Sequence, residues 1–170
     1  MKWCNARSEK EGLTPVCYTS GDLATVYRTG QAAFVNWSAN GYRLPTEAEW
    51  EFAARGGVNS HGSVYSGSNN IDEVAWYYNN SSNNSHPVAT KMANELGVYD
   101  MSGNVREWCW DLYDVYSELA QSDPRGPSGG SASRVNRGSC FVLFDCRITL
   151  RFNDYPDRHT YTLGFRCARK

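Results

Sequence analysis

The chain has 170 residues, a formal net charge of −1, 14% aromatic residues and only 21% charged residues. This length indicates one domain, which is large enough to bury a core without disulfides. The near-neutral charge and the lack of a lysine and arginine cluster argue against nucleic-acid binding. No apolar run is long enough to span a bilayer, and the polar sequence after Lys2 does not resemble a signal peptide.

The first predicted element is a helix at the very start of the chain. The segment MKWCNARSEKEG has helical spacing, and Gly12 is typical of the residue that follows a helix. The next segment, residues 17–30, predicts a hairpin with Gly21 and Asp22 near its turn.

The clearest local signal is GYRLPTEAEWEFAARGG, which predicts an extended stretch followed by a helix. The residue before a proline is biased toward extended backbone, so residues 41–44 are expected to be extended. Thr46 is a good N-cap, Glu49 completes a capping box, and Gly56 with Gly57 ends the helix. One apolar face of this helix is formed by Trp50, Ala53 and Ala54.

The glutamates of this helix have two interpretations. Glu47, Glu49 and Glu51 are expected to serve in capping, helix-dipole and solvent contacts, with catalysis as the alternative.

The middle of the chain is predicted to be mostly irregular. Residues 58–95 carry no regular period, and NNSSNNSH within them indicates a polar surface loop. Gly97 and Gly103 are expected at turns, and residues 122–133 form a loop rich in glycine, proline and serine.

Six cysteines are present, with no CxxC pair and no zinc-binding spacing. An even number permits disulfides, but buried free thiols are at least as compatible with a domain of this size. The cysteines are Cys4, Cys17, Cys109, Cys140, Cys146 and Cys167.

Four motifs resemble a known family. GYRLPTEAEWEFAARGG, NELGVYDMSGNVREWCWD, RVNRGS and LGFRCAR follow the order and spacing of the formylglycine-generating enzyme, or sulfatase-modifying factor, domain. The resemblance implies an α+β, C-type-lectin-like fold of this type over residues 1–170, with little regular secondary structure. Because the family domain normally begins well before MKWCN, it also implies an N-terminally truncated domain.

The resemblance implies one enzymatic alternative. The founding members of the family oxidise a sulfatase cysteine to formylglycine and hold copper(I) with two cysteines five residues apart, a soft ligand pair that suits this ion. Here Cys140 and Cys146 are six apart, and counting back from GFRCAR puts the second family position at Leu143. A copper oxidase acting on a protein cysteine therefore has Cys140 and Cys146 as its catalytic candidates.

A narrower resemblance comes from residue types that are missing near the C-terminus. Residues 138–165 contain no Lys, Glu, Gln, Met or Trp, although residues 1–137 contain 23 of them. The variable proteins of diversity-generating retroelements mutate adenines, and their favoured codon, AAC, keeps a pyrimidine at its third base. Codons that end in a pyrimidine cannot encode these five residue types.

Within this resemblance, residues 137–166 are the variable ligand-binding region. The segments RVNRG, CR and GFR, with Arg151 and Pro156, stand where such regions resemble one another. The resemblance implies a receptor-like protein that binds a protein or cell-surface ligand and is displayed on a bacterium or phage; a non-diversified, non-catalytic family member is a further alternative. The expected ligand-binding residues are Val142, Leu143, Phe144, Asp145, Leu150, Phe152, Asn153, Asp154, Tyr155, Asp157, Arg158, Thr160, Tyr161 and Thr162.

The turn SGNVREW resembles a calcium site of the family. Asn104 and Glu107 would supply side-chain oxygens and Val105 a carbonyl oxygen, the ligand type that hard cations prefer. The alternative is a turn that Asn104 holds by hydrogen bonding its own backbone. We expect a structural calcium ion, and copper only under the enzymatic alternative.

Five arginines of the C-terminal segment are expected to be structural and to pair with carboxylates beneath the binding surface. The expected carboxylates are Asp100, Glu107 and Asp111. The arginines are Arg134, Arg137, Arg147, Arg151 and Arg166.

Overall fold

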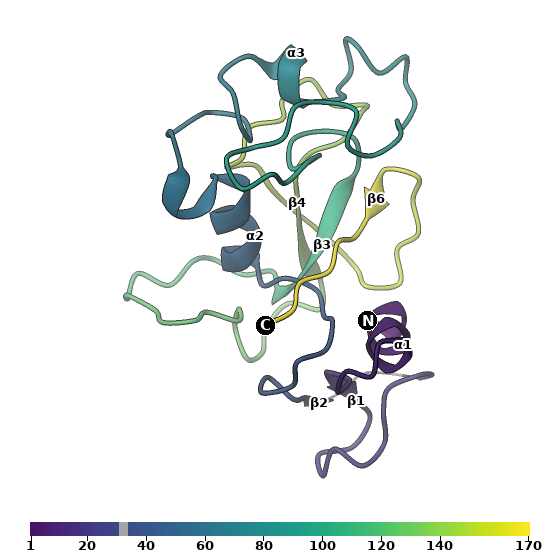
Figure 1. The fold of residues 1–170 in the computed structure, drawn as a ribbon. Helices are drawn as coiled ribbons and strands as arrows, with labels where there is room; N and C mark the ends of the chain where they lie inside the picture. The colour runs from purple at the N-terminus through teal and green to yellow at the C-terminus, as the bar shows by residue number, and fades with distance from the viewer. Residues whose placement is uncertain (31–33) are drawn as a thin grey trace. The chain divides into compact units, whose positions relative to one another are not determined.

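The computed structural model describes residues 1–30 and 34–170. The chain divides into two compact units (Figure 1). The smaller unit combines Met1–Pro45 with Arg166–Lys170, and the larger unit is Thr46–Phe165. The smaller unit therefore contains both ends of the chain, and the assignment of residues 1–170 to one domain stays a prediction.

The smaller unit contains helix α1 (Lys2–Lys10) and two short strands, β1 (Cys17–Tyr18) and β2 (Phe34–Val35), which pair antiparallel. The predicted helix is confirmed, and Gly12 follows it with a positive φ of 70°. The buried side chain of Asn5 ties the helix to the strand region, because its amide group donates to the carbonyl of Cys17 at 2.7 Å.

The predicted hairpin of residues 17–30 is present only in part. Tyr18 forms an isolated antiparallel bridge with Val26, so the segment does fold back on itself. The strand β1, however, pairs with β2 rather than with the end of this segment. The sequence pattern identified the turn but not the partner strand.

Two cysteines of the smaller unit lie in contact. The Sγ atoms of Cys4 and Cys167 are 3.4 Å apart, and all six cysteines of the chain are free thiols. Hydrogen bonding from the Cys167 thiol lowers the pKa of Cys4. Because the thiolate is the form that reacts, this pair is placed to form a disulfide on oxidation.

We expect a mild oxidant such as diamide to link Cys4 to Cys167 and to raise the melting temperature, because a cross-link restricts the unfolded chain. Peptide mapping under non-reducing conditions measures the linkage. The peptides of Cys17 and Cys109, both fully buried, serve as internal controls and should keep free thiols. A linkage involving either control cysteine, or no linkage at all, would contradict the expectation.

The larger unit begins with helix α2 (Glu47–Ala54), whose predicted capping box is confirmed. Thr46 Oγ1 accepts from the Glu49 backbone at 3.2 Å, and the Glu49 carboxylate accepts from the Thr46 backbone at 2.8 Å. Gly56 then ends the helix with a φ of 87°. Two short helices follow, the 3-10 helix η1 (Gly57–Asn59) and α3 (Ile71–Val74).

A four-stranded sheet forms the centre of the larger unit, in the order β5-β4-β3-β6. The strands are β3 (Arg106–Leu112), β4 (Arg134–Arg137), β5 (Arg151–Asp154) and β6 (Leu163–Gly164). Strands β3, β4 and β5 pair antiparallel, whereas β6 runs parallel to β3.

Side chains alternate between the two faces of this sheet. Along β3, Glu107, Cys109 and Asp111 are buried, and the residues between them are half-buried. Helix α2 covers the buried face, because the Trp50 indole donates to Glu107 Oε2 at 2.7 Å and the Glu47 backbone donates to Asp111. The opposite face carries Arg106.

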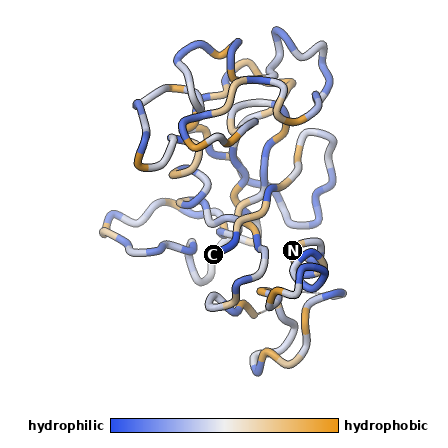
Figure 2. Tube along the Cα trace, viewed as in Figure 1, coloured by the Kyte–Doolittle hydropathy of each residue, from blue (hydrophilic) through white to orange (hydrophobic). Residues whose placement is uncertain are grey.

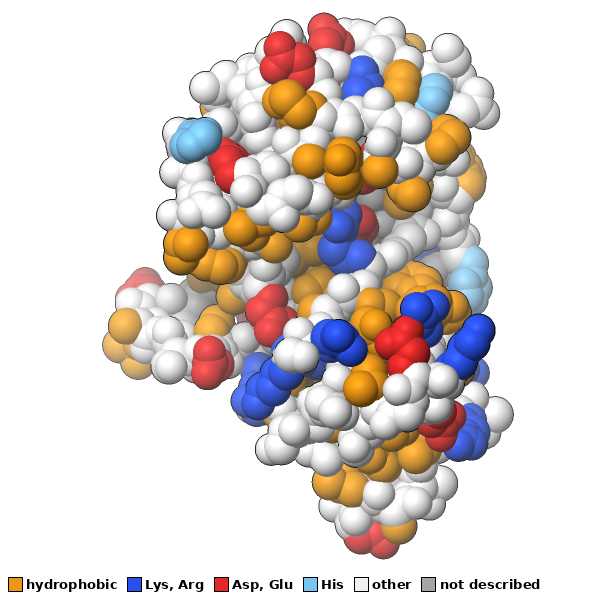
Figure 3. All heavy atoms as spheres, in the orientation of Figure 1, with side chains coloured by type: hydrophobic (Ala, Val, Ile, Leu, Met, Phe, Trp, Pro, Cys, Tyr) orange, Lys and Arg blue, Asp and Glu red, His pale blue; other side chains and the backbone are white. Residues whose placement is uncertain are grey.

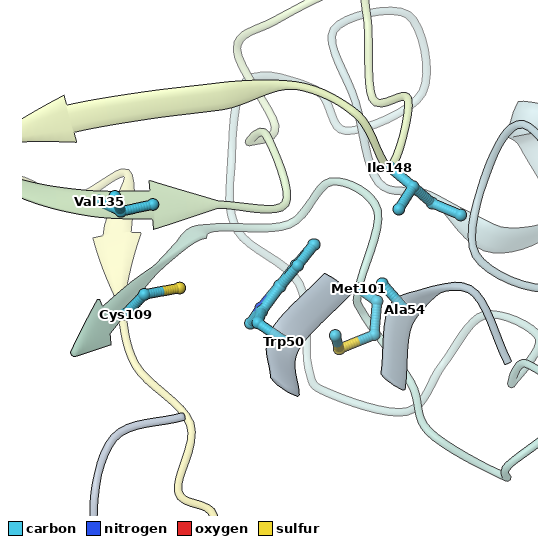
Figure 4. Close-up of a cluster of buried hydrophobic side chains, with 6 residues drawn as sticks. All are labelled: Trp50, Ala54, Met101, Cys109, Val135 and Ile148. Carbon is cyan, nitrogen blue, oxygen red and sulfur yellow. The ribbon is translucent and has the colours of Figure 1, made fainter. Parts of the chain in front are cut away.

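The core of the larger unit lies between α2 and this buried face (Figure 4). Trp50 is 1% exposed, and its ring points from α2 toward the strands. The predicted apolar face of the helix is therefore confirmed. The clustered residues are Trp50, Ala54, Met101, Cys109, Val135 and Ile148.

Irregular segments make up most of the remaining larger unit, as the sequence predicted. Residues 79–85 form a mainly exposed polar loop that is coloured mostly hydrophilic in Figure 2. Gly97 and Gly103 have positive φ values of 72° and 79°, in line with their predicted turns. The observed α+β architecture confirms the fold class. In the described residues, no helix is both long and apolar enough to cross a membrane.

Candidate ligand-binding surface

Arg106 is the first residue of β3 and lies on the sheet face that α2 does not cover. Its Nη1 atom lies 3.2 Å from Asp154 Oδ2, and its guanidinium lies 5.4 Å from the centroid of the Phe152 ring. The same group donates to the side chains of Asn136 and Thr162 at 3.3 and 3.5 Å. The guanidinium group of Arg106 thereby holds together side chains from β5 and from the connection between β5 and β6.

A second part of this surface is the turn that follows β4. Phe144 at this turn is 64% exposed, and its ring lies 4.1 Å from that of Tyr78. The Tyr78 backbone donates to the Leu143 carbonyl at 3.0 Å, which holds the two segments together. Phe141 lies 5.9 Å from Tyr161, so the turn and the β5–β6 connection meet at this ring pair.

Most of the fourteen expected ligand-binding residues are accessible. Thirteen of them are exposed or half-buried, including Tyr155 at 64% and Tyr161 at 77%. We call these residues, without Asn153, the C-terminal surface. Its twelve members are Val142, Leu143, Phe144, Asp145, Leu150, Phe152, Asp154, Tyr155, Asp157, Arg158, Thr160 and Tyr161.

Two of the fourteen expected residues do not lie on the same accessible face as the others. Thr162 is only 8% exposed, and its hydroxyl group is bonded to Thr160 at 2.7 Å, so it lies within the support of the surface. Asn153 is exposed, but strand alternation directs it with Arg151 to the sheet side that α2 covers, opposite Phe152 and Asp154.

Buried residues alternate with the exposed ones and anchor the segment. The backbone of Phe141 donates to the Asn104 carbonyl at 2.9 Å, and its carbonyl accepts from Ser81 Oγ at 2.8 Å. Ser139 Oγ donates to the Asp145 carbonyl at 2.6 Å. These anchoring bonds do not involve the exposed side chains, although Asp145 and Thr160 of the same segment also accept from the backbones of Arg147 and Thr162.

The two cysteines of the enzymatic alternative are both buried. Burial raises the pKa of Cys140 and raises the pKa of Cys146 to about 12. Cys146 packs in an apolar cluster with Ala75 and Tyr77. Since a copper ion requires thiolates, these surroundings favour core thiols over a metal pair.

The residues of the expected calcium site have protein partners in the structure. Asn104 Oδ1 accepts from the His86 backbone at 3.1 Å, and its amide donates back to the His86 carbonyl. Glu107 Oε2 accepts from the Trp50 indole. Asn104 therefore holds the turn by hydrogen bonds, as in the alternative to calcium binding. Its partner is the backbone of His86, 18 residues earlier, and not the backbone of the turn itself. A calcium ion would need the side-chain oxygens of Asn104 and Glu107, and both already accept hydrogen bonds from the protein. The two residues therefore fit a calcium ion poorly.

Calcium binding by Asn104, Val105 and Glu107 stays a prediction with a direct test. If calcium binds, excess chelator should lower the melting temperature, because an ion bound only by the folded state stabilises it. Differential scanning calorimetry with and without chelator measures the shift. An unchanged melt would contradict calcium binding. In the described parts of the chain, no group of three or more His, Cys, Asp or Glu side chains could hold a metal ion.

The carboxylate partners expected for Arg137, Arg147 and Arg151 are wrong, because Arg147 pairs with Asp145 and the other two pair with residues of α2. Asp111 and Glu107 accept from groups of α2, whereas the buried Arg137 pairs with Glu47 and Glu51. Arg151 also pairs with Glu47, at 2.8 Å. The interpretation of Glu47 as a residue in solvent contact is therefore wrong too, because it is 5% exposed and binds two guanidinium groups.

The sequence model of the sulfatase-modifying factor enzyme 1-like domain matches residues 2–170. The chain belongs to this family. Among its relatives, the chaperone protein LppX of Paenibacillus barcinonensis is 42% identical over 160 residues, which cover 80% of this chain and 57% of that protein. The formylglycine-generating enzyme of Streptomyces coelicolor is 36% identical over 186 residues, which cover 96% of this chain and 55% of the enzyme.

A solved structure extends the comparison. Treponema denticola variable protein 1 has a TM-score of 0.83 and 34% identity, with 99% of this chain and 66% of that chain covered. The resemblance to the sulfatase-modifying factor family and to a variable protein is thus confirmed, and so is the fold prediction. The chain spans little more than half the length of the two curated relatives.

Proposed function

We propose that this sulfatase-modifying factor domain is a receptor-like binding protein whose C-terminal surface is diversified by a retroelement and binds a protein or cell-surface ligand. One observation carries the proposal. The positions that the resemblance marks as variable are accessible at thirteen of fourteen sites, while buried residues between them bond to the scaffold. This partition is what a surface needs in order to change its side chains without losing its fold.

The chemistry of the exposed side chains also suits recognition. Phe144, Tyr155 and Tyr161 are each more than 60% exposed, and aromatic rings supply contact area at low conformational cost. Charged groups accompany them, since Arg158 lies 3.6 Å from Asp154. Such charges at the rim of an interface influence partner choice and association rate more than affinity.

The first test is the DNA that surrounds the gene. We expect a nearby near-copy of the codons for residues 137–166 that differs only where the copy has adenine. Positions of mismatch should then coincide with the C-terminal surface and avoid buried residues such as Ile148 and Arg137. The absence of any such copy would contradict diversification and leave a fixed binding protein.

At the protein level, the C-terminal surface should tolerate substitution. The triple variant Phe144→Ser, Tyr155→Ser and Tyr161→Ser is expected to change the free energy of unfolding by less than about 1.5 kcal/mol, because exposed positions contribute little. Urea denaturation measures this. The matched control is Ile148→Ser, a buried position of the same segment, which should be strongly destabilising. A triple variant as unstable as the control would contradict the proposal.

A further inference from the structure

A second concave site lies on the other side of the sheet from the Arg106 face. It is a cavity of about 700 Å³ between α2 and the loop that follows β3. In Figure 3 the loop that follows β3 projects as a lobe on the left, and apolar side chains lie on the surface beside it. Its volume is that of a site for a small molecule, and none of the residues of the C-terminal surface lines it.

The walls of the cavity are mainly apolar and are accessible to a ligand. Phe52 from α2 is 57% exposed, and Val115 and Tyr116 from the loop are 88% and 63% exposed. Pro124 and Pro127 complete this side. Several large apolar side chains that converge on one hollow are unusual on a surface and indicate an apolar occupant.

The lining of the cavity contains a buried carboxylate that only one other described residue is seen to hydrogen bond. Asp111 is 4% exposed, and its Oδ2 atom accepts from the Glu47 backbone at 2.7 Å. Its Oδ1 atom receives no hydrogen bond from another residue in the described part of the chain. A buried carboxylate oxygen in this situation is a strong acceptor for a donor brought by a ligand.

The charges around the cavity favour a cation. Four carboxylates line it, from Glu47, Glu51, Asp111 and Asp114, against the guanidinium groups of Arg55 and Arg151 and that of Arg137 behind Glu47 and Glu51. The cations are already engaged. Arg151 binds both Glu47 oxygens, and Arg55 pairs with Glu51 at 2.7 Å.

We propose that this cavity binds a small molecule with an apolar, aromatic-sized body and a protonated amine, with the amine paired to Asp111. The body would lie against Phe52 and Val115, and the ammonium group would donate to Oδ1. An anionic ligand fits less well, because the arginines that could receive it are neutralised by Glu47 and Glu51. The site is independent of diversification at the C-terminal surface.

Three probes of one shape test the charge preference. The full chain is titrated with 2-phenylethylamine, 2-phenylethanol and 3-phenylpropanoate by isothermal titration calorimetry and saturation-transfer NMR at neutral pH. We expect the amine to bind about tenfold more tightly than the alcohol, since a hydrogen bond to a charged group is stronger than a neutral one. The carboxylate should bind most weakly. Equal binding of amine and alcohol, tighter binding of the carboxylate, or no binding of any probe would overturn the proposal.

Variants test the place of binding. Asp111→Asn retains an acceptor for the Glu47 backbone and should weaken amine binding about tenfold, with little effect on the alcohol. Ala48→Trp adds a ring to an exposed helix position that lines the cavity, and should remove binding of amine and alcohol alike. The matched control is Glu118→Gln, an exposed carboxylate of the same loop that does not line the cavity.

Melting temperatures establish that each variant is folded before its binding is compared. Unchanged amine binding in folded Asp111→Asn, or weakened binding in Glu118→Gln to the same extent, would overturn the assignment to Asp111. Because the variants change only this cavity and its loop, the result is independent of whether a template copy is found beside the gene.

Discussion

Replacement of Glu47 by leucine is expected to lower the free energy of unfolding by about 3–5 kcal/mol, the usual cost of removing one partner of a buried ion pair. Glu47 is 5% exposed and accepts from Arg137, Arg151 and Tyr116 at distances of 2.8 to 3.0 Å. The loss would leave Arg137, which is fully buried, with Glu51 as its remaining carboxylate. Chemical denaturation of the purified chain measures the change.

Two further variants make the Glu47 result interpretable. Arg137→Met should cost less, because Glu47 keeps its bonds to Arg151 and Tyr116 when Arg137 is removed. Arg55→Ala removes an exposed pair with Glu51 and should cost less than about 1 kcal/mol. If Glu47→Leu were no more destabilising than Arg55→Ala, the central role that we assign to Glu47 would be wrong.

Replacement of Trp50 by alanine is expected to cost about 3–5 kcal/mol, the range for deletion of a large core side chain. Trp50 is 1% exposed and packs in the cluster of Figure 4, and its indole donates to Glu107 at 2.7 Å. Arg137 also lies 5.3 Å from the centroid of its ring. The variant should therefore lose apolar packing and polar contacts together.

The conservative variant separates these contributions. Trp50→Phe keeps most of the ring but removes the indole donor, so it should cost about 1–3 kcal/mol. Phe52→Ala, an exposed aromatic position of the same helix, is the matched control and should be close to neutral. A cost for Trp50→Phe equal to that of Trp50→Ala would assign the whole effect to the hydrogen bond with Glu107 and not to packing.

The sequence predicted correctly those features that depend only on residues close together in the chain. The capping box of Thr46 and Glu49 lies within four residues, and the glycines at 12, 56 and 103 have the positive φ values that their turns require. The fold class and the accessible C-terminal residues followed from motifs that resemble a family. These predictions needed no knowledge of distant contacts.

Contacts between distant residues were beyond such signals. Glu47 has the spacing of an ordinary residue in a first helical turn, and its partners Arg137 and Arg151 lie 90 and 104 residues away. The partner of β1 is another such case, because the pattern of residues 17–30 already suggested a self-contained hairpin. The cavity at Asp111 has no sequence signature, since its walls come from a helix, a strand and a loop.

The alternation of β5 limits how this protein can evolve. Phe152 and Asp154 lie on the Arg106 face of the sheet. Arg151, the first residue of the same strand, binds Glu47 on the α2 side. A shift of one residue in this strand would exchange the two faces and place a recognition side chain where the ion pair belongs. Point substitutions at Phe152 and Asp154 leave this alternation intact, although a change at Asp154 also removes its ion pair with Arg106, whereas insertions or deletions of single residues within β5 would disrupt the fold. New binding specificities in this strand must arise at constant length.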